Sequence, residues 1–529
     1  MGGAKFCRFA LFPLMLFMLL FLPTRMVAQT TTEDPRYDFF KDLEGITDVT
    51  IYDFYGYPWQ KLNLKAEGME NLGFTFPEGS KVLMSSNYHV NKSFPTTLIR
   101  FKVSKPILLT SQVLVSSEEN CDFFSINVDD KTILFISGKM QTECKILLSA
   151  GEHALSLKYQ KNGGGDRYAD RAFLYNLKTS TTIDDYVADY ESSNNTLTFK
   201  KIKSGNLGAL NLNRIAMVYT TQTVSNMCDF LGVEAKTIKN IVFEENFKTY
   251  APTSLNRFFR YLYGLQTITD LKYLNTANVT DMSDMFCFCE ELSSLDLTNF
   301  ITANVTDMST MFDGCSALTT IYASDKFVTG QVTDGSGMFC DCSSLKGYSD
   351  SKTDHTYANY KTGYFSKLVG KNGEEKIGAT GETLTTNNLV LDDGKDFVAY
   401  ETFAAKVASY SRTMKEGTTW ATLCLPFAID LSQVKECKFY RLTGIDNDCI
   451  TLESYEEGAK IPAGTPVLFK MNEGKQTLSI SAQDAGIVKE PVAGTNTDEK
   501  ERIYKARDAG GKYHLLHPPR SLDYGSRRH

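Results

Sequence analysis

The sequence has no large excess of charge of either sign. Its 529 residues contain 56 Lys and Arg against 63 Asp and Glu, a formal net charge of -7, and the pI is about 5.6. Nucleic-acid-binding domains attract phosphate through clustered basic side chains, so DNA or RNA is disfavoured as the main partner. The length exceeds the ~100–200 residues of one domain, and several domains are therefore expected.

The sequence also lacks recognisable catalytic and metal-binding motifs. No GxSxG, P-loop or dinucleotide fingerprint occurs between a strand and a helix. The neighbouring carboxylates Asp129/Asp130 and Asp392/Asp393 point apart in a strand or turn. A cysteine peptidase built on Cys424 is disfavoured because this residue lies in an apolar strand pattern. We expect no enzyme, no catalytic residue, no metal site and no cofactor; the six histidines form no HExxH or HxH pattern: His89, His153, His355, His514, His517 and His529.

Long apolar runs are absent beyond the first residues. Lys5 and Arg8 precede the run from Phe9 to Leu22, and this pattern predicts a signal peptide over residues 1–28. An uncleaved anchor is the alternative. No later segment is long and apolar enough to span a bilayer, so we expect an exported protein, secreted or held at the cell surface, with no membrane span in the mature chain.

A repeat occupies the middle of the sequence. NVTDMSDMF at 278–286 recurs as NVTDMSTMF at 304–312 and as QVTDGSGMF at 331–339. A diverged copy precedes them at 254–259, so four coils span about 252–347. One coil cannot bury its own apolar stripe, so stacked coils and end caps are expected.

Each coil has two halves with different patterns. Met282, Met285 and Phe286 recur at i, i+3 and i+4, which indicates a short helix or a helical turn. Leu292, Leu295 and Leu297 alternate with polar residues, as in a strand. All six are predicted to point inward; the outward strand positions are candidate binding residues, with Tyr322 as the main anchor: Thr269, Asp296, Thr298, Tyr322 and Ser324.

Five of the twelve cysteines lie inside the repeat. Cys289, Cys315 and Cys342 share one register, and Cys287 and Cys340 lie two residues earlier. A metal site is disfavoured because pairs two coils apart would be roughly 10 Å from each other. Disulfides between stacked coils are disfavoured by parallel Cβ directions. A ladder of buried thiols is the favoured interpretation.

The repeat resembles the BspA-like leucine-rich-repeat proteins of Bacteroidetes, whose motif is shared by mycoplasma surface lipoproteins. The resemblance covers about 175 residues, from NTLTFKKI at 195–202 through PTSLNRFF and LKYLNTANVTDMSDMF to YANYKTGYF at 357–365. It implies a location on the outer surface of a Gram-negative bacterium. It also implies binding of host or neighbouring-cell proteins.

Short β-rich runs flank the repeat on both sides. Residues 29–185 alternate strands and turns, as in a sandwich, with a hairpin turn at Asp129-Asp130-Lys131; residues 121–177 resemble jelly-roll modules of secreted bacterial proteins. Residues 367–388 are polar and glycine-rich and are predicted to be a linker. Residues 389–511 are predicted to be a β-rich module, and 512–529 an unstructured basic tail.

These patterns predict a multidomain, mainly β protein: an N-terminal β-sandwich or jelly roll (29–185), a leucine-rich-like repeat solenoid with caps (186–366) and a C-terminal β-rich module. The expected function is non-enzymatic adhesion through the solenoid. Expected partners are extracellular-matrix, host or bacterial surface proteins. The alternative is a surface glycan-binding protein that stacks sugars on Tyr168 and Tyr175 of the jelly roll.

Overall fold

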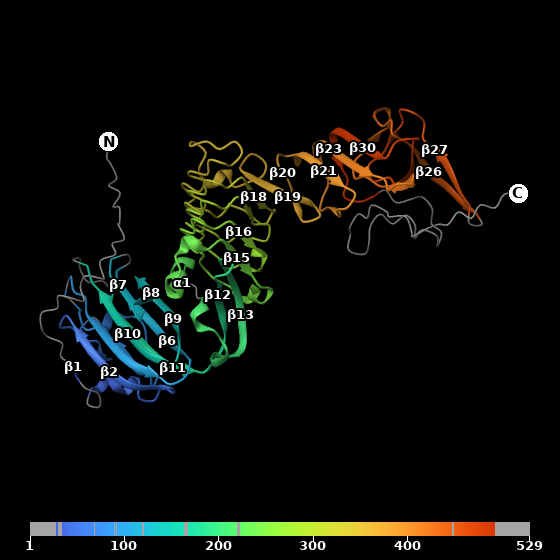
Figure 1. The fold of residues 1–529 in the computed structure, drawn as a ribbon. Helices are drawn as coiled ribbons and strands as arrows, with labels where there is room; N and C mark the ends of the chain where they lie inside the picture. Colours follow the sequence, from blue (N-terminus) through green and yellow to red (C-terminus); the bar gives the residue numbers. More distant parts are fainter. Residues whose placement is uncertain are drawn as a thin grey trace. The chain divides into compact units, whose positions relative to one another are not determined.

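The computed structural model describes residues 28–29 and 34–491, apart from 68, 89, 91, 119–120, 163–167, 219–222 and 447–448. The predicted basic tail and, Ala28 apart, the predicted signal peptide lie outside the described residues. The fold is mainly β, with several separate sheets (Figure 1). The chain divides into two compact units, one of residues 1–189, 201–218 and 226–233 and one of the remainder.

Two antiparallel sheets build most of the first unit. Their orders are β1-β2-β5-β10-β7-β8 and β3-β4-β11-β6-β9. Trp59, next to β3, is fully buried, and its ring centroid lies 5.1 Å from that of Phe124 in β7, so both sheets contribute to one core. The strands are Ala28–Gln29 (β1), Ile46–Phe54 (β2), Gln60–Lys61 (β3), Val82–Met84 (β4), Thr96–Val103 (β5), Ile107–Ser116 (β6), Phe123–Val128 (β7), Lys131–Ser137 (β8), Lys139–Leu148 (β9), Gly151–Gln160 (β10) and Arg171–Ser180 (β11).

The predicted hairpin turn at Asp129 and Asp130 is confirmed. Both residues have positive φ, 49° and 66°, and they join β7 to its antiparallel neighbour β8. Two successive positive φ angles give the turn a twist that matches the right-handed twist of the flanking strands. Local turn chemistry was sufficient to place this hairpin.

Shorter strands and one α-helix lead into the repeat. β12 pairs with β14 in antiparallel fashion, and the start of β13 pairs with β15 in parallel, as β15 does with β16. Phe199 of β13 stacks on Phe243 of β15, with ring centroids 4.8 Å apart. These elements are Thr182–Glu191 (β12), Thr196–Asn206 (β13), Ile215–Met217 (β14), Val224–Leu231 (α1), Asn240–Phe243 (β15) and Thr267–Thr269 (β16).

The repeats form a regular stack of coils, hereafter the repeat stack (residues 254–345). Parallel bridges join Ser254 to Asp281, Asp281 to Asp307 and Asp307 to Asp334. Ser294–Asp296 (β17) pairs in parallel with Thr320–Ala323 (β18), which brings Leu295 opposite Ile321. Figure 1 shows these coils as successive turns in green and yellow. The predicted inward residues are all buried, so the register is confirmed: Met282, Met285, Phe286, Leu292, Leu295 and Leu297.

The first half of each coil is a series of turns without an α-helix. Asp284 donates its backbone N–H to Ser309 of the next coil (2.9 Å), whereas Cys287 donates to Asp284 three residues earlier in the same coil (3.1 Å). Phe286 and Phe288 follow the first pattern, and Cys289 the second. An α-helix needs every N–H to point along its own axis, so the short-helix alternative is wrong, and turns closed by bonds three residues back take its place.

The predicted linker at 367–388 is also wrong. This segment contains most of Phe365–Asn372 (β19), all of Glu375–Ala379 (β20) and the start of Thr385–Asp392 (β21). β19 pairs in parallel with β18 and in antiparallel fashion with β20 and with β22 (Phe397–Ala399). The glycines that suggested flexibility instead lie in strands or turns: Gly370 belongs to β19 and Gly378 to β20, whereas Gly373, with φ of 59°, lies between these two strands.

The remaining strands pack around one core that includes Phe427, Phe469 and Tyr410. Their sheets are β21-β23-β30, β24-β29-β26-β27 and β25-β28. The strands are Phe397–Ala399 (β22), Phe403–Thr413 (β23), Trp420–Leu423 (β24), Ile429–Asp430 (β25), Cys437–Asp446 (β26), Cys449–Ser454 (β27), Lys460–Ile461 (β28), Val467–Met471 (β29) and Thr477–Ile487 (β30). Short 3₁₀ helices are Pro35–Phe39, Met69–Asn71, Leu207–Ala209, Leu212–Arg214, Ala235–Thr237, Glu245–Thr249, Leu271–Tyr273, His355–Tyr357 and Leu431–Gln433.

The register makes a first testable prediction. Leu295→Asp places an unpaired carboxylate in the core of the repeat stack and should lower the free energy of unfolding by about 3 kcal/mol or more. Ser294→Asp is the matched control, because Ser294 is exposed on the same strand. Urea denaturation followed by circular dichroism measures both. Equal midpoints for the two variants would contradict the assigned register.

Candidate binding faces of the repeat stack

The residues predicted to bind lie on the strand face, the outward side of β16, β17 and β18. Asp296 Oδ1 accepts hydrogen bonds from the backbone N–H (3.0 Å) and the hydroxyl (2.6 Å) of Thr298. Ser324 Oγ donates to the Thr298 carbonyl at 2.7 Å. Asp296, Thr298, Tyr322 and Ser324 thus gather on the β17–β18 pair, whereas Thr269 is exposed on β16 in a different sheet.

β20 covers the centre of this strand face. Lys376 of β20 forms an ion pair with Asp296, and its ammonium lies 5.7 Å from the ring centroid of Tyr322. The Tyr322 hydroxyl donates to the Lys376 carbonyl at 3.3 Å. A Cβ on Gly378 would lie 3.0 Å from Tyr322 Cε1, so glycine permits the close approach. Tyr322 is therefore half-buried by the protein's own chain, and the role of these residues in binding stays a prediction.

Burial and pairing act in opposite directions on the Asp296 carboxyl. Burial alone raises its pKa, but the Lys376 ammonium and the two Thr298 hydrogen bonds outweigh it and lower the pKa below the usual value. Asp296 is consequently ionised at neutral pH and holds β20 against the strand face.

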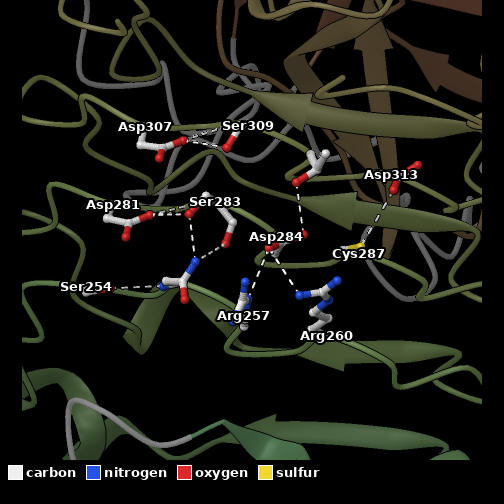
Figure 2. A network of polar contacts seen from close by, with 12 residues as sticks. Ser254, Arg257, Arg260, Asp281, Ser283, Asp284, Cys287, Asp307, Ser309 and Asp313 are labelled. Carbon is white, nitrogen blue, oxygen red and sulfur yellow. Dashed lines mark hydrogen bonds and ion pairs between the residues drawn. The ribbon is translucent and has the colours of Figure 1, made fainter. Parts of the chain in front are cut away.

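A second surface, the turn face, lies on the turn half of each coil. Asp281 Oδ1 accepts from the backbone N–H (2.9 Å) and the hydroxyl (2.5 Å) of Ser283, and Asp307 does the same with Ser309 (2.9 and 2.7 Å; Figure 2). Asp334 and Ser336 repeat the arrangement. Each aspartate satisfies backbone donors of its own turn, which explains the conserved spacing of Asp and Ser within the repeats of this chain.

Two positions in each coil have a left-handed backbone, with positive φ. One register holds Arg257, Asp284, Thr310 and Gly337; the other holds Tyr261, Phe288, Gly314 and Asp341. Residues other than glycine pay roughly 1–2 kcal/mol for this conformation, and bulky residues rarely adopt it. Two large aromatic residues in the second register are thus unusual.

The two rings of this register and the neighbouring ring of Tyr263 form an aromatic stripe, defined as Tyr261, Tyr263 and Phe288. The Tyr261 centroid lies 5.9 Å from that of Tyr263 and 5.7 Å from that of Phe288, with nearly parallel planes. Tyr261 is 36% exposed and Tyr263 42% exposed. Phe288 lies over the next coil, where a Cβ on Gly314 would be only 2.5 Å from Phe288 Cδ1. Tyr261 and Tyr263 are therefore open to solvent, whereas Phe288 is half-buried.

Charged side chains lie beside the stripe, and only some of them form ion pairs. Asp284 takes both nearby guanidinium groups, Arg257 at 3.2 Å and Arg260 at 3.3 Å (Figure 2). The ion pairs found in the described part of the chain include none for Glu290, Asp313 or Asp341. Burial and the negative charges of Asp341 and Asp284 raise the pKa of Asp313. The sequence analysis missed this face, although aromatic residues aligned with Gly314 were a visible signal.

The cysteines of the repeat are free thiols. Cys289, Cys315 and Cys342 are fully buried, and each Sγ donates to the carbonyl of a phenylalanine in the preceding coil, at 3.3, 3.1 and 3.0 Å. Burial raises the pKa of these thiols well above the usual value. The ladder of buried thiols is confirmed, and its chemistry is that of unreactive core residues.

A hollow of about 260 Å³ lies on the six-stranded sheet and is lined by charged residues that include Arg100, Glu152 and His153. His153 Nδ1 lies 2.6 Å from Asp129 Oδ2, and Nε2 lies 2.9 Å from the Ser149 carbonyl. Two acceptors favour the doubly protonated ring, and the pKa of His153 is raised, chiefly by the Asp129 carboxylate. Such a ring is a structural cation and is poorly suited to act as a general base.

The proposed sugar platforms of the first unit differ in exposure. Tyr168 is exposed, with the Lys139 ammonium 5.0 Å from its ring centroid. Tyr175 is only 2% exposed, packs edge-on against Phe76 and accepts a hydrogen bond from Gln141. The prediction that Tyr175 stacks on a glycan is therefore wrong, because its ring belongs to the core.

The turn face lies within the part of the chain that matches a known family. Residues 223–351 match the model described as "Mycoplasma protein of unknown function, DUF285". The match covers the repeat stack and α1 but less than half of the chain. A comparison with curated proteins finds no match.

Among solved structures, similarity is distant. The secreted serine protease VesC from Vibrio cholerae is 14% identical (TM-score 0.21), and the match covers 29% of this chain and 28% of that one. A family 35 carbohydrate binding module from Clostridium thermocellum is 16% identical (TM-score 0.14; 24% and 91%). An exo-beta-1,3-galactanase from Phanerochaete chrysosporium is 13% identical (TM-score 0.14; 24% and 28%). This chain thus spans less than a third of the protease and of the galactanase, and none of these matches assigns an activity to it.

Two searches of the described residues gave negative results. Neither α1 nor any other helix in these ranges has the length and hydropathy needed to cross a membrane. Within the same ranges, His, Cys, Asp and Glu side chains do not gather in a group of three or more that could hold a metal ion.

The close approach of Phe288 makes a second prediction. Gly314→Ala combines a left-handed backbone with a clash against the Phe288 ring and should destabilise the protein by about 1–2 kcal/mol. Gly330→Ala is the control, since its backbone is not left-handed and a Cβ there meets open space. Urea midpoints distinguish the two, and an unchanged midpoint for Gly314→Ala would contradict the packing of Phe288 over this coil.

His153 makes a third prediction, on pH. Because its pKa is raised in the folded protein, its contribution to stability is fully present below about pH 6.5 and is lost as the pH rises through the folded-state pKa. His153→Gln should therefore reduce the free energy of unfolding more at about pH 5.5 than at about pH 9. Asp129→Asn should flatten the same pH dependence. A loss that does not change with pH would show that the Asp129 contact is not ionic.

Proposed function

We propose that this chain is a non-enzymatic surface adhesin that binds proteins through its repeat stack. The stack is interpreted as a short BspA-like leucine-rich solenoid, flanked by a jelly-roll-like sandwich and a C-terminal β-rich module. The proposed location is the outer surface of a Gram-negative bacterium or its surroundings. The proposed partners are extracellular-matrix, host or bacterial surface proteins.

The aromatic stripe is the observation that carries this proposal. Tyr261 and Phe288 keep left-handed backbones that disfavour bulky residues, and Tyr261 does so while exposed to solvent. Folding gains little from an exposed ring, and the equivalent position in the third coil is Gly314. Strain of this kind at the surface supports a role in binding.

The stripe also suits a protein partner. Rigid aromatic side chains offer large contact areas at a low entropic cost, which is why they dominate binding hot spots. The strand face offers less free surface at its centre, since β20 contacts both Asp296 and Tyr322. The turn face is therefore the favoured site. The strand face is the alternative, and the binding experiment below distinguishes the two.

A fourth prediction tests this assignment. The purified chain is applied to a panel of immobilised extracellular-matrix and bacterial surface proteins. Tyr261→Ala/Phe288→Ala should weaken binding to a captured partner about tenfold or more, because two hot-spot rings are removed. Phe135→Ala is the matched control, because Phe135 is an exposed aromatic residue on β8. Circular dichroism establishes that each variant is folded.

Two further variants place the site. If Tyr322→Ala or Asp296→Ala abolishes binding and Tyr261→Ala/Phe288→Ala does not, the binding site is the strand face. Binding unaffected by all of these changes would contradict adhesion through the repeat stack. No binding to any member of the panel would contradict the proposed partner class.

A further inference from the structure

We propose that the turn face binds an arginine-containing, extended segment of its partner, with guanidinium groups stacked on the aromatic stripe and paired with the carboxylates beside it. This inference rests on the proposed function, because it names the chemistry of the partner at the same face. It follows from an imbalance of charge and from a contact within the chain itself.

The chain already contains one example of the proposed contact. The guanidinium carbon of Arg260 lies 4.4 Å from the ring centroid of Tyr261, and its Nη1 donates to Asp284 at 3.3 Å. One cation is thus held by a ring and a carboxylate together. A guanidinium group over an aromatic face is attracted by the ring electrons, and a carboxylate adds a charge-assisted hydrogen bond.

The second coil repeats the ring, as Phe288, but neither it nor the later coils repeat the cation. Phe288 stacks on Tyr261, and its backbone N–H donates to the Asp313 carbonyl at 2.7 Å, while the Asp313 carboxylate accepts from Sγ of Cys287, the residue before Phe288, at 3.8 Å. The register of Arg260 continues as Cys287, Asp313 and Cys340, none of which is cationic. An arginine from a partner can supply the group that these coils lack.

The charge around the stripe favours a basic partner. Asp284 is neutralised by Arg257 and Arg260, whereas the described residues provide no ion-pair partner for Asp313, Asp341 or Glu290. Burial raises the pKa of Asp313, and the negative charges of Asp341 and Asp284 raise it further. An incoming cation relieves this repulsion, and an acidic or phosphorylated segment would increase it.

The spacing of the rings fits an extended chain. Side chains on one face of a strand recur every ~6.7 Å. The ring centroids of the stripe are 5.7 to 6.4 Å apart. The three centroids form a nearly equilateral triangle, so an extended segment with arginine at alternate positions can place two guanidinium groups over two of the rings.

The fifth prediction uses a defined probe. A fluorescein-labelled peptide of alternating Arg and Ser is titrated with the purified chain, and fluorescence anisotropy reports binding. A second peptide carries citrulline in place of arginine, which keeps the planar shape and removes the charge. We expect the arginine peptide to bind at least about tenfold more tightly, with an affinity that falls as salt is added.

Variants assign this binding to the turn face. Tyr261→Leu/Phe288→Leu keeps the apolar volume and removes both rings, and should weaken the arginine peptide about tenfold. Asp313→Asn should weaken it several-fold and reduce its dependence on salt. Glu416→Gln removes one exposed carboxylate from the C-terminal sheets and should leave binding unchanged. If the leucine pair is misfolded by circular dichroism, Tyr261→Leu alone replaces it.

Several results would overturn the inference. Equal affinity for the two peptides would exclude a role for the cation. An equal loss for Glu416→Gln and Asp313→Asn would show that binding is only general attraction to an acidic protein. If Tyr261→Ala/Phe288→Ala abolishes capture of a protein partner while the arginine peptide does not bind, the proposed function stands and the basic segment is excluded. If the arginine peptide binds as described and no protein partner is captured, the proposed function fails and this inference stands.

Discussion

The repeat stack depends on how the backbone of each turn distributes its hydrogen bonds. Along residues 284–289, alternate N–H groups donate to the next coil and the others donate three residues back within the same coil. Every donor of a buried segment must find an acceptor, and this alternation satisfies both directions. It also requires left-handed residues twice in each coil. The glycines at these positions follow from this requirement, whereas Tyr261 and Phe288 adopt the same backbone conformation although it disfavours bulky residues.

The same ladder fixes the interior. Coils that are joined at every second residue place equivalent side chains above one another, so Phe259, Phe286, Phe312 and Phe339 stack with centroids 5.2 to 5.7 Å apart. The hydroxyl groups of Thr276 and Thr302 also join successive coils. Each Oγ1 donates a hydrogen bond to a backbone carbonyl of the following coil and accepts one from a backbone N–H of that coil. The core of the repeat stack is thus specified by stacking and by hydrogen bonds that recur with the repeat.

The parts of this fold that local patterns encode could be predicted from the sequence. Leu295 and Met285 recur with the repeat, which was sufficient to assign their register, and Asp129-Asp130 has the composition of its turn. The contact of Lys376 with Asp296 and Tyr322 could not be predicted in this way, because it joins residues far apart in the sequence. The predicted linker was wrong for a related reason: glycine and polar residues suit an edge hairpin as well as a flexible segment, and only the pairing of β19 with β18 distinguishes them. The aromatic stripe was missed because Tyr261 and Phe288 interrupt no hydrophobic pattern.

The constant offset between coils has a consequence for how such a protein can change over generations. Equivalent bridge residues are 26 or 27 positions apart, and the backbone bridges of each coil join it to the adjacent coil. A tandem duplication of one repeat in the gene would therefore insert a complete coil whose donors and acceptors are already matched to those on either side. Deletion of one repeat would close the gap in the same way. The length of this stack can thus change by whole repeats under selection, while both ends keep their present contacts. The number of aromatic rings and carboxylates on the turn face changes with it.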